Sequence, residues 1–308
     1  MIFIDEYNKK RLRIFLRRCF FMRKIAVIGA GNIGKAAAKS VLESPDMELC
    51  GFVRRNGEPV SGFEKIPAAK SAFDLPEKPD GAIICLPSRL AEPAEKELLK
   101  AGIFTADCFD IHEELPALRR RLSVSAKKGG VSAITGAGWD PGLDSVIRIL
   151  VSLAMPEGEM FTNFGPGMSM GHSVAVKAIP GVAEAVSLTL PLGKGKHFRK
   201  IYAVLRPGAD KSAVEHAILS DGYFEHDGCS VEFAEDILPF INTSHGVEIE
   251  STAGNRKINF RMRIDNPTAT ANILAAAMRA AFLQKPGAYF LPEIPPCDLS
   301  AEGWGTYL

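Results

Sequence analysis

Five short apolar runs, separated by stretches with helical periodicity, divide the first half of the chain. The runs are rich in β-branched residues, and we predict buried strands at 25–28, 47–53, 80–87, 103–107 and 130–135. Helices are expected between several of them, at 33–42, 91–101 and 115–128. Strands that alternate with helices form a parallel sheet with helices packed on it. The first half is therefore predicted to be a doubly wound α/β domain of Rossmann type.

The pattern changes after a predicted helix at 143–153. Apolar and polar residues now alternate, as in strands with one exposed face, at 186–190, 200–205, 231–233, 247–250 and 258–264. A helix is expected at 213–219, a hairpin turn at 252–255, and a long helix of small residues at 266–283. We predict a second, α+β domain with an open, mostly antiparallel sheet.

The segment 161–173 between these parts is dense in glycine and shows little apolar periodicity. Such a segment is either a flexible connector or a binding loop rich in exposed backbone. Its methionines, phenylalanines and histidine argue against a solvated linker.

The first predicted strand leads into a glycine loop with chemical significance. Gly29, Gly31 and Gly34 have the G-x-G-x-x-G spacing, and an alanine-rich helix follows. In dinucleotide-binding domains these glycines allow a tight turn, the approach of a pyrophosphate and the packing of helix on strand. The helix N-terminus favours the anion. An ordinary strand-to-helix turn is the alternative.

The second predicted strand ends in Arg54 and Arg55, about twenty residues beyond the loop. An acidic residue at this place holds the ribose 2′-hydroxyl of NAD. Guanidinium groups match a phosphate instead, which predicts NADP. A solvated basic turn is the alternative.

Composition changes this picture little. The chain has 308 residues, 46% hydrophobic and 24% charged, which suits two domains, and its formal net charge of +1 indicates neither nucleic acid nor a membrane surface as partner. No apolar run approaches the ~20 residues of a membrane helix. Six scattered cysteines without C-x-x-C spacing indicate thiols in a reducing cytoplasm, and no metal-ligand spacing is present.

Polar residues follow several predicted strands. Ligands bind doubly wound sheets beyond the carboxyl ends of the strands, so Arg89, Asp107, Asp110 and the loop 136–142 are candidate site residues. Helix capping is the alternative for Asp110 and for Asp140, and a surface arginine is the alternative for Arg89.

Two segments closely resemble meso-diaminopimelate dehydrogenase: Trp139–Gly142 and the longer Asn163–Gly181. The resemblance extends from about residue 24 to the C-terminal region. It implies NADP-dependent, reversible oxidative deamination at the D-configured carbon of meso-2,6-diaminopimelate, giving L-2-amino-6-oxopimelate and ammonia, in a homodimer. The motifs at 85–89 and 168–172 are similar to the branch with wider D-amino acid tolerance. Lysine and cell-wall biosynthesis or catabolism both remain open as the working direction.

The resemblance also implies roles for individual residues. It places Asp110 and Asp140 in the substrate site, where they would bind ammonium groups or carry protons during imine hydrolysis. The other implied substrate ligands are Trp139, Phe164, Met170, Gly171, His172, Thr189, Arg199, His245 and Asn266. The predicted cofactor residues are Gly29, Gly31, Asn32, Ile33, Gly34, Arg54, Arg55, Leu86, Pro87, Ser88, Arg89 and Asp107. His172 and His245, taken alone, are also compatible with hydrogen-bonded structural histidines.

The expected domains follow from these assignments. Residues 1–21 are expected to be a non-essential extension or the result of an over-long gene prediction, with a short basic amphipathic helix as the alternative. Residues 22–142 are expected to bind NADP, 143–265 to bind substrate and dimerise, and 266–308 to return to the first domain. Two other functions remain open: an NADP-dependent cyclic-imine reductase, and a non-catalytic NADP-sensing regulator. The dehydrogenase hypothesis predicts that Asp110, Arg199 and His245 share one cavity, whereas the regulator hypothesis does not.

Overall fold

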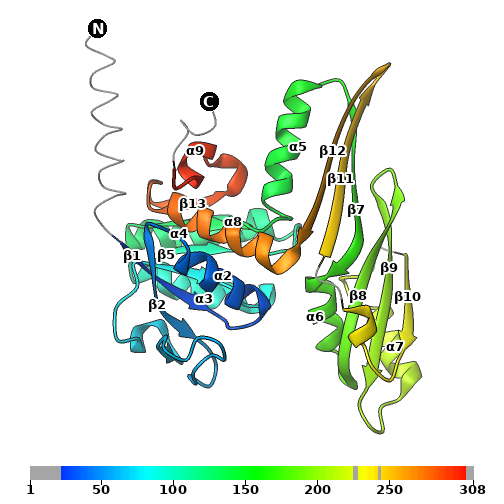
Figure 1. Cartoon of the computed structure of the whole chain (residues 1–308), viewed down its shortest axis with the longest axis horizontal. Coiled ribbons are helices and arrows are strands. Elements are labelled where there is room, and N and C mark those ends of the chain that lie inside the picture. Colours follow the sequence, from blue (N-terminus) through cyan, green and yellow to red (C-terminus); the bar gives the residue numbers. More distant parts are fainter. Residues whose placement is uncertain (1–21, 225–227, 242–243, 303–308) are drawn as a thin grey trace. The chain divides into compact units, whose positions relative to one another are not determined.

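The computed structural model describes residues 22–224, 228–241 and 244–302, so the predicted extension 1–21 lies outside the described residues. The chain divides into two compact units (Figure 1). Unit 1 contains the residues up to Ser145 and those from Thr270 onward, and unit 2 contains Val146–Ala269.

Unit 1 is built on a seven-stranded sheet in the order β13-β6-β5-β4-β1-β2-β3. Every pair of neighbouring strands is parallel. The strands are β1 (Arg23–Ile28), β2 (Met47–Val53), β3 (Ala68–Ala69), β4 (Gly81–Ile84), β5 (Phe104–Asp107), β6 (Ser132–Thr135) and β13 (Gly287–Phe290). The helices are α2 (Asn32–Leu42), α3 (Ser88–Lys100), α4 (Leu115–Gly129), most of α8 (Asn266–Ala281) and the short α9 (Pro296–Leu299). The predicted Rossmann-type fold is confirmed.

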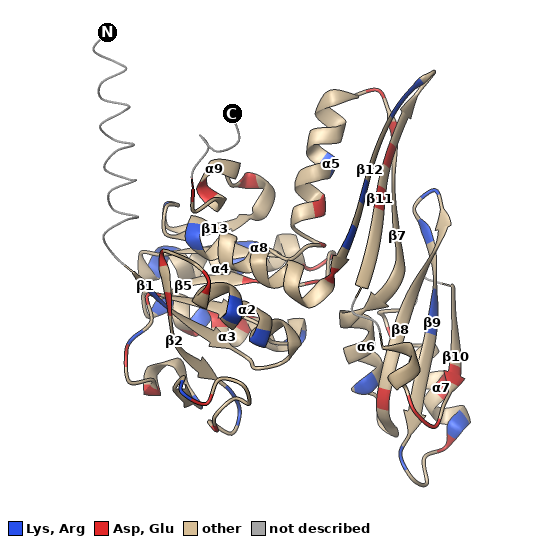
Figure 2. Ribbon diagram, in the orientation of Figure 1, with Lys and Arg blue, Asp and Glu red and all other residues tan. Residues whose placement is uncertain are grey.

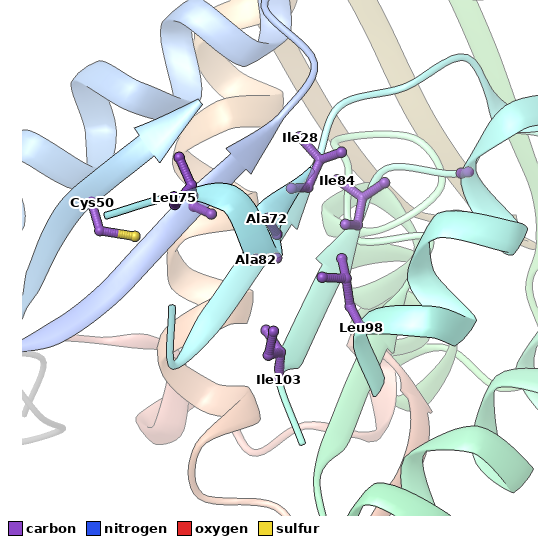
Figure 3. Packing of buried hydrophobic residues seen from close by; sticks show 10 residues of the cluster. Ile28, Cys50, Ala72, Leu75, Ala82, Ile84, Leu98 and Ile103 are labelled. Carbon is purple, nitrogen blue, oxygen red and sulfur yellow. The ribbon is translucent and has the colours of Figure 1, made fainter. Parts of the chain in front are cut away.

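The core of unit 1 explains why its strands are apolar without alternation. Ile25, Ala26 and Val27 in the central strand β1 are fully buried, because the sheet is covered on both faces. On one face, residues of β1 and β4 pack against Leu98 and Ile103 (Figure 3). The parallel pairing of these strands places the carboxyl ends of β1, β4 and β5 side by side at one edge of the buried sheet.

The C-terminal part of the chain completes unit 1. The Phe282 ring lies 4.8 Å from that of Phe104, and Arg279, nearly buried in α8, holds Asp46 with bonds of 2.6 and 2.8 Å. Strand β13 pairs with β6 at the edge of the sheet. Strand β13 was not predicted, because it follows a proline, begins with a glycine and carries no alternation.

Unit 2 contains a six-stranded sheet in the order β10-β9-β8-β7-β11-β12. Its pairs are antiparallel except β9 with β10, so the predicted mostly antiparallel sheet is confirmed. The strands are β7 (Glu159–Ser169), β8 (Val182–Gly193), β9 (Lys196–Leu205), β10 (Gly228–Phe233), β11 (Ser244–Ala253) and β12 (Arg256–Asp265). The helices are α6 (Met170–Lys177), α7 (Lys211–Leu219) and most of α5 (Leu143–Ala154).

The prediction for residues 161–173 was wrong. The segment is neither connector nor loop: it forms most of strand β7 and the first turn of α6. Its glycines allow close contact between strands, because a Cβ at Gly167 would lie 2.6 Å from the Cα of His245. A register shift in the pairing of β7 with β11 also disrupts the simple alternation.

Alternation in the central strands of unit 2 creates two different faces. On β9, Ile201 and Ala203 pack with α6 and α7, whereas Tyr202 faces the other way and stacks on Phe240. The predicted hairpin turn is present between β11 and β12, whose opposite charges pair across the strands, as with Lys257 and Glu250 (Figure 2). None of the described helices has the length and apolarity needed to cross a bilayer.

Candidate active site

The glycine loop of unit 1 brings three backbone segments together. A Cβ at Gly29 would lie 2.5 Å from the carbonyl oxygen of Cys85, and one at Gly34 would lie 2.1 Å from the carbonyl oxygen of Gly29. Both distances are too short for any side chain, so these glycines allow β1, α2 and the end of β4 to meet. Gly29 also has φ +100°, which favours glycine.

Gly31 has a different role. Its exposed Cα faces open space, since an added Cβ would meet no atom within 4 Å. Gly31 is the N-cap of α2, and no acidic side chain lies in the first turn, where Asn32 and Ile33 stand. The uncapped N–H groups and the helix dipole suit a diphosphate. The loop therefore has the space and the charge preference that a dinucleotide requires.

The two arginines after β2 differ in their contacts. The Arg54 guanidinium donates to the backbone carbonyls of Pro59, at 3.1 Å, and Glu58, and so holds the loop 54–60. Arg55 is exposed. Both stand at the end of the strand beside β1, as expected for residues near an adenosine ribose.

Beyond β4 the chain enters α3 through Leu86, Pro87, Ser88 and Arg89, and these residues lie at the point where strand order reverses between β1 and β4. Arg89 is exposed in the first turn of the helix. Ser88 is committed to the protein, because its hydroxyl donates to Asp110 Oδ1 at 2.6 Å and accepts from the Asp110 N–H at 3.1 Å. Asp110 is not a helix cap, since α4 begins at Leu115 with Glu114 as its N-cap.

Asp140 lies in the loop between β6 and α5. Its carboxylate is 16% exposed, and Oδ1 lies 3.7 Å from His112 Nε2. The neighbouring Trp139 is nearly buried, and its carbonyl accepts the N–H of Asp144 at the start of α5. Gly142 permits this tight loop, since a Cβ there would lie 2.0 Å from the Gly138 carbonyl oxygen.

The structure does not support Asp107 as a side-chain ligand of the cofactor. Its carboxylate is 1% exposed, and Oδ1 accepts the N–H groups of Phe109 and Gly136 at 2.8 and 3.0 Å. The residue ends β5 as predicted, but the side chain turns into the protein rather than toward a ligand.

In unit 2, strand register places three predicted substrate residues in one row across the sheet. Arg199 pairs with Thr189, Thr189 pairs with Gly167, and Gly167 pairs with His245. Directly paired residues project to the same face of a sheet. Arg199, Thr189 and His245 are all buried, at 8%, 0% and 4% exposure, which is exceptional for a cluster containing arginine.

Arg199 is held by two partners, Thr189 in this row and His197 beside it. One guanidinium nitrogen donates to the Thr189 hydroxyl, and another lies 2.9 Å from His197 Nε2. His197 was not predicted, although it stands two residues before Arg199 on β9 and therefore on the same face. The Phe164 ring contacts His197 edge-on, with ring centroids 6.3 Å apart.

His245 is neutral in this cluster. Burial, followed by repulsion from Arg199 and His197, lowers its pKa to about 4, against an opposing hydrogen bond to the Gly246 carbonyl oxygen. The Nδ1 atom lies 2.9 Å from that oxygen, so Nδ1 carries the proton and Nε2 is the basic nitrogen. One fixed positive charge and one neutral imidazole thus occupy the row. A carboxylate bound here would pair with Arg199 and favour protonation of His245.

The remaining predicted substrate residues border this row in different ways. Met170 and Gly171 form the first turn of α6, directly after Ser169, which pairs with Ser187 two residues from Thr189. Asn266 is buried at the start of α8. His172 is bonded to the Ser169 hydroxyl at 2.8 Å and packed against two aromatic rings, which favours its structural alternative.

The candidate residues thus form one set in each unit. Asp110 and Asp140 belong to unit 1, whereas Arg199 and His245 belong to unit 2, so their sharing one cavity stays a prediction. No group of three or more His, Cys, Asp or Glu among residues 22–224, 228–241 and 244–302 is arranged to hold a metal ion.

Two family models match the chain. The NAD-binding Rossmann fold of an oxidoreductase family matches residues 23–108, and the diaminopimelic acid dehydrogenase C-terminal domain matches residues 138–195. The meso-diaminopimelate D-dehydrogenase of Bacteroides fragilis is 41% identical over 90% of this chain and 96% of its own length.

Solved structures agree with these matches. An engineered D-amino acid dehydrogenase bound to NADP+ superposes with a TM-score of 0.79 at 27% identity, covering 91% of this chain and 96% of that one. The Corynebacterium glutamicum diaminopimelate dehydrogenase, in complex with diaminopimelate, gives a TM-score of 0.76 at 26% identity, covering 90% and 95%.

The fold, the glycine loop and the Rossmann match together define the class: this protein is an oxidoreductase that uses a nicotinamide cofactor. Identity over nearly the whole of both chains narrows the class further. The chain belongs to the meso-diaminopimelate D-dehydrogenase family.

Alanine at Gly31 should affect cofactor binding, whereas alanine at Gly34 should affect the stability of the fold. Gly31→Ala should weaken NADPH binding by more than about ten-fold, because the methyl group would occupy the open space above the helix N-terminus, and it should change the free energy of unfolding by less than about 0.5 kcal/mol. Gly34→Ala should destabilise the protein by about 2 kcal/mol or more, because the methyl group meets backbone. Fluorescence titration and urea unfolding measure both quantities. An unchanged NADPH affinity in Gly31→Ala would contradict the assignment of this loop to diphosphate binding.

The lowered pKa of His245 predicts a pH-dependent loss of stability. Because the pKa is about 4 in the folded protein and about 6.5 when unfolded, the contribution is complete above pH 6.5 and is lost as pH falls through 4. The size of the loss is on the order of 3 kcal/mol. His245→Asn should lack this component in urea unfolding measured across that range. The exposed His216→Asn is the matched control and should follow the unmodified protein. If the free energy of unfolding of His245→Asn kept the pH dependence of the unmodified protein, the lowered pKa could not belong to His245.

Proposed function

We propose that this protein catalyses the NADP-dependent, reversible oxidative deamination of meso-2,6-diaminopimelate at its D-centre, giving L-2-amino-6-oxopimelate and ammonia, and that it also accepts other D-amino acids. Its family membership supports the reaction, and the buried row of Arg199, Thr189 and His245 is the structural observation that carries it. In this proposal unit 1 binds the cofactor and unit 2 binds a substrate carboxylate.

The row in unit 2 is suited to a carboxylate. Burying Arg199 costs free energy that an anionic partner offsets, and its guanidinium can donate two parallel hydrogen bonds to one carboxylate. The Thr189 hydroxyl and the buried amide of Asn266 add neutral donors. His245 becomes a further donor when the bound carboxylate raises its pKa. Such a site recognises a substrate by its charge and by the geometry of its acid group.

Asp110 and Asp140 in unit 1 are suited to act on the amine and imine nitrogen of the substrate. The reaction removes a hydride from the carbon that carries the amine, water then adds to the resulting imine, and ammonia leaves. Asp110, held by Ser88, and Asp140, beside His112, can bind an ammonium group and accept protons from the amine and the attacking water. Their partners fix where each carboxylate points.

The cofactor in this proposal is NADP, which when bound accepts and returns the hydride. Gly31 and the N-terminus of α2 would hold the diphosphate, and exposed Arg55 would hold the 2′-phosphate. Arg54 shapes the same loop through its bonds to backbone carbonyls. A structural neighbour bound to NADP+ supports this preference over NAD. The five described cysteines are thiols, in keeping with a cytoplasmic enzyme.

Spectrophotometric assay of NADP reduction tests the reaction. We expect turnover with meso-diaminopimelate and NADP, little with the L,L isomer or with NAD, and measurable turnover with D-alanine. Asp110→Ala should lower kcat by at least about 100-fold while NADPH binding changes little, because the carboxylate acts on the substrate. Turnover of none of these substrates, with NADPH binding intact, would contradict the proposal and favour an imine reductase or a regulator.

We also propose that the protein is a homodimer. In unit 2, Ile149, Leu150 and Leu153 of α5 are 44%, 58% and 73% exposed, and Phe260 of β12 is 36% exposed. A row of large apolar side chains of this kind on a helix indicates a surface that a second copy covers. Sedimentation should give twice the mass of 33.3 kDa, and Leu153→Glu should shift it toward monomer. A monomeric unmodified protein at micromolar concentration would contradict this assignment.

A further inference from the structure

Two carboxyl groups are buried together beneath the carboxyl ends of β4, β5 and β6. Glu95 projects from the third turn of α3 and is 0% exposed, and Asp107 at the end of β5 is 1% exposed. They hydrogen-bond to each other through their side chains. Neither the deamination chemistry nor the cofactor loop uses this pair directly, yet burying two acids at one place is costly.

The pair retains one proton. Glu95 Oε1 accepts from the Thr105 hydroxyl at 2.6 Å, and Asp107 Oδ1 accepts two backbone N–H groups. Apart from the bond between the two carboxyl groups, Glu95 Oε2 and Asp107 Oδ2 have no hydrogen-bond partner in the described parts of the chain. Two carboxyl groups can hydrogen-bond to each other only when one of them carries a proton. Burial raises the pKa of both groups, and Glu95 keeps the proton because backbone N–H groups favour ionised Asp107.

Asp107 connects the two loops that carry the proposed catalytic carboxylates. Its Oδ1 accepts from Phe109, the residue before Asp110, and from Gly136, at the start of the loop that leads to Asp140. Its backbone carbonyl accepts the N–H of Ala137 at 2.7 Å. A shift of this one carboxylate would therefore move both loops.

Helix α3 holds the same arrangement from the other side. Ser88, at its first position, bonds to the Asp110 carboxylate at 2.6 Å, and Glu95 follows seven residues later on the same face of the helix. The helix thus contacts Asp110 directly at one end and contacts Asp107 two turns further along.

We propose that Glu95 and Asp107 form a one-proton acid pair whose role is to position Asp110 and Asp140. Glu95 donates its proton to Asp107, and ionised Asp107 holds the backbone of both loops. The proposal takes the roles of Asp110 and Asp140 from the proposed function. Neither Glu95 nor the carboxylate of Asp107 touches the substrate.

The charged groups around the pair define the pH effect to be measured. Glu92, one turn earlier on α3, is ionised beside Arg121 and Lys96, which lower its pKa to about 2. On the β5 side lie Asp110 and the thiol of Cys108, whose pKa burial raises. Since the pKa of Glu95 is raised on folding, its contribution to stability is complete below the ordinary pKa of glutamate and is lost as pH rises through the folded value.

The test compares Glu95→Gln with Glu95→Leu. Glutamine can still donate to Asp107 and accept from Thr105, so kcat should stay within about three-fold of the unmodified enzyme, and any alkaline decrease in kcat that arises from Glu95 should disappear. Leucine fills the space but cannot donate, so kcat should fall by about 10- to 100-fold, with KM and NADPH affinity changed by less than about three-fold. Glu92→Gln, on the same helix but paired at the surface, is the matched control and should leave all values unchanged.

Hydrogen exchange of the peptides covering 108–112 and 136–142 gives a readout that needs no turnover. Exchange should accelerate in Glu95→Leu and stay near normal in Glu95→Gln, and this result holds even if the substrate proposal fails. Equal loss of kcat in both variants, or an unmodified exchange rate and pH profile in Glu95→Leu, would overturn the positioning role. If Glu95→Leu does not fold, Thr105→Val should produce a smaller change in the same direction, and an unaltered pH profile there would also overturn it.

Discussion

The cofactor-binding half of this protein depends on contact between backbone segments that no side chain separates. At Gly29 and Gly34 the first strand, the first helix and the end of β4 come so close that a single methyl group would meet a carbonyl oxygen. This contact sets the angle at which α2 leaves the sheet and hence the direction of its N–H groups. In the proposed function, the arginines after β2 and the polar residues after β4 act together with this N-terminus, because β1 lies between β2 and β4 in the sheet.

Unit 2 contains a buried cation, the guanidinium of Arg199. The Arg199 guanidinium hydrogen-bonds to Thr189 and His197, and these two groups partly compensate the free-energy cost of its desolvation. The neighbouring His245 remains neutral because a second buried positive charge would be too costly. The row therefore carries one buried positive charge beside a neutral imidazole, which is the combination that the proposed carboxylate would meet.

The fold class could be predicted because burial on both faces leaves continuous apolar runs in unit 1, and burial on one face leaves alternation in unit 2. Strand β7 could not, because the glycines that let it approach β11 also remove the alternation by which a strand is recognised. The row formed by Arg199, Thr189 and His245 depends on register across the four strands β9, β8, β7 and β11, and the position of β11 beside β7 is not encoded by any local pattern. Likewise Glu95 resembles any acidic residue of an amphipathic helix, and its burial follows from the position of Asp107 on another element.

The order of elements along the chain also has a consequence for how the protein is made. Strand β13 is the last strand in the described part of the chain, yet it pairs with the edge of β6, which is complete about 150 residues earlier. Until the ribosome has released residues 287–290, β6 presents an unpaired edge. Unit 1 is therefore completed only after all of unit 2 has been synthesised, and a truncated product that ends before Gly287 would leave the edge of β6 unpaired.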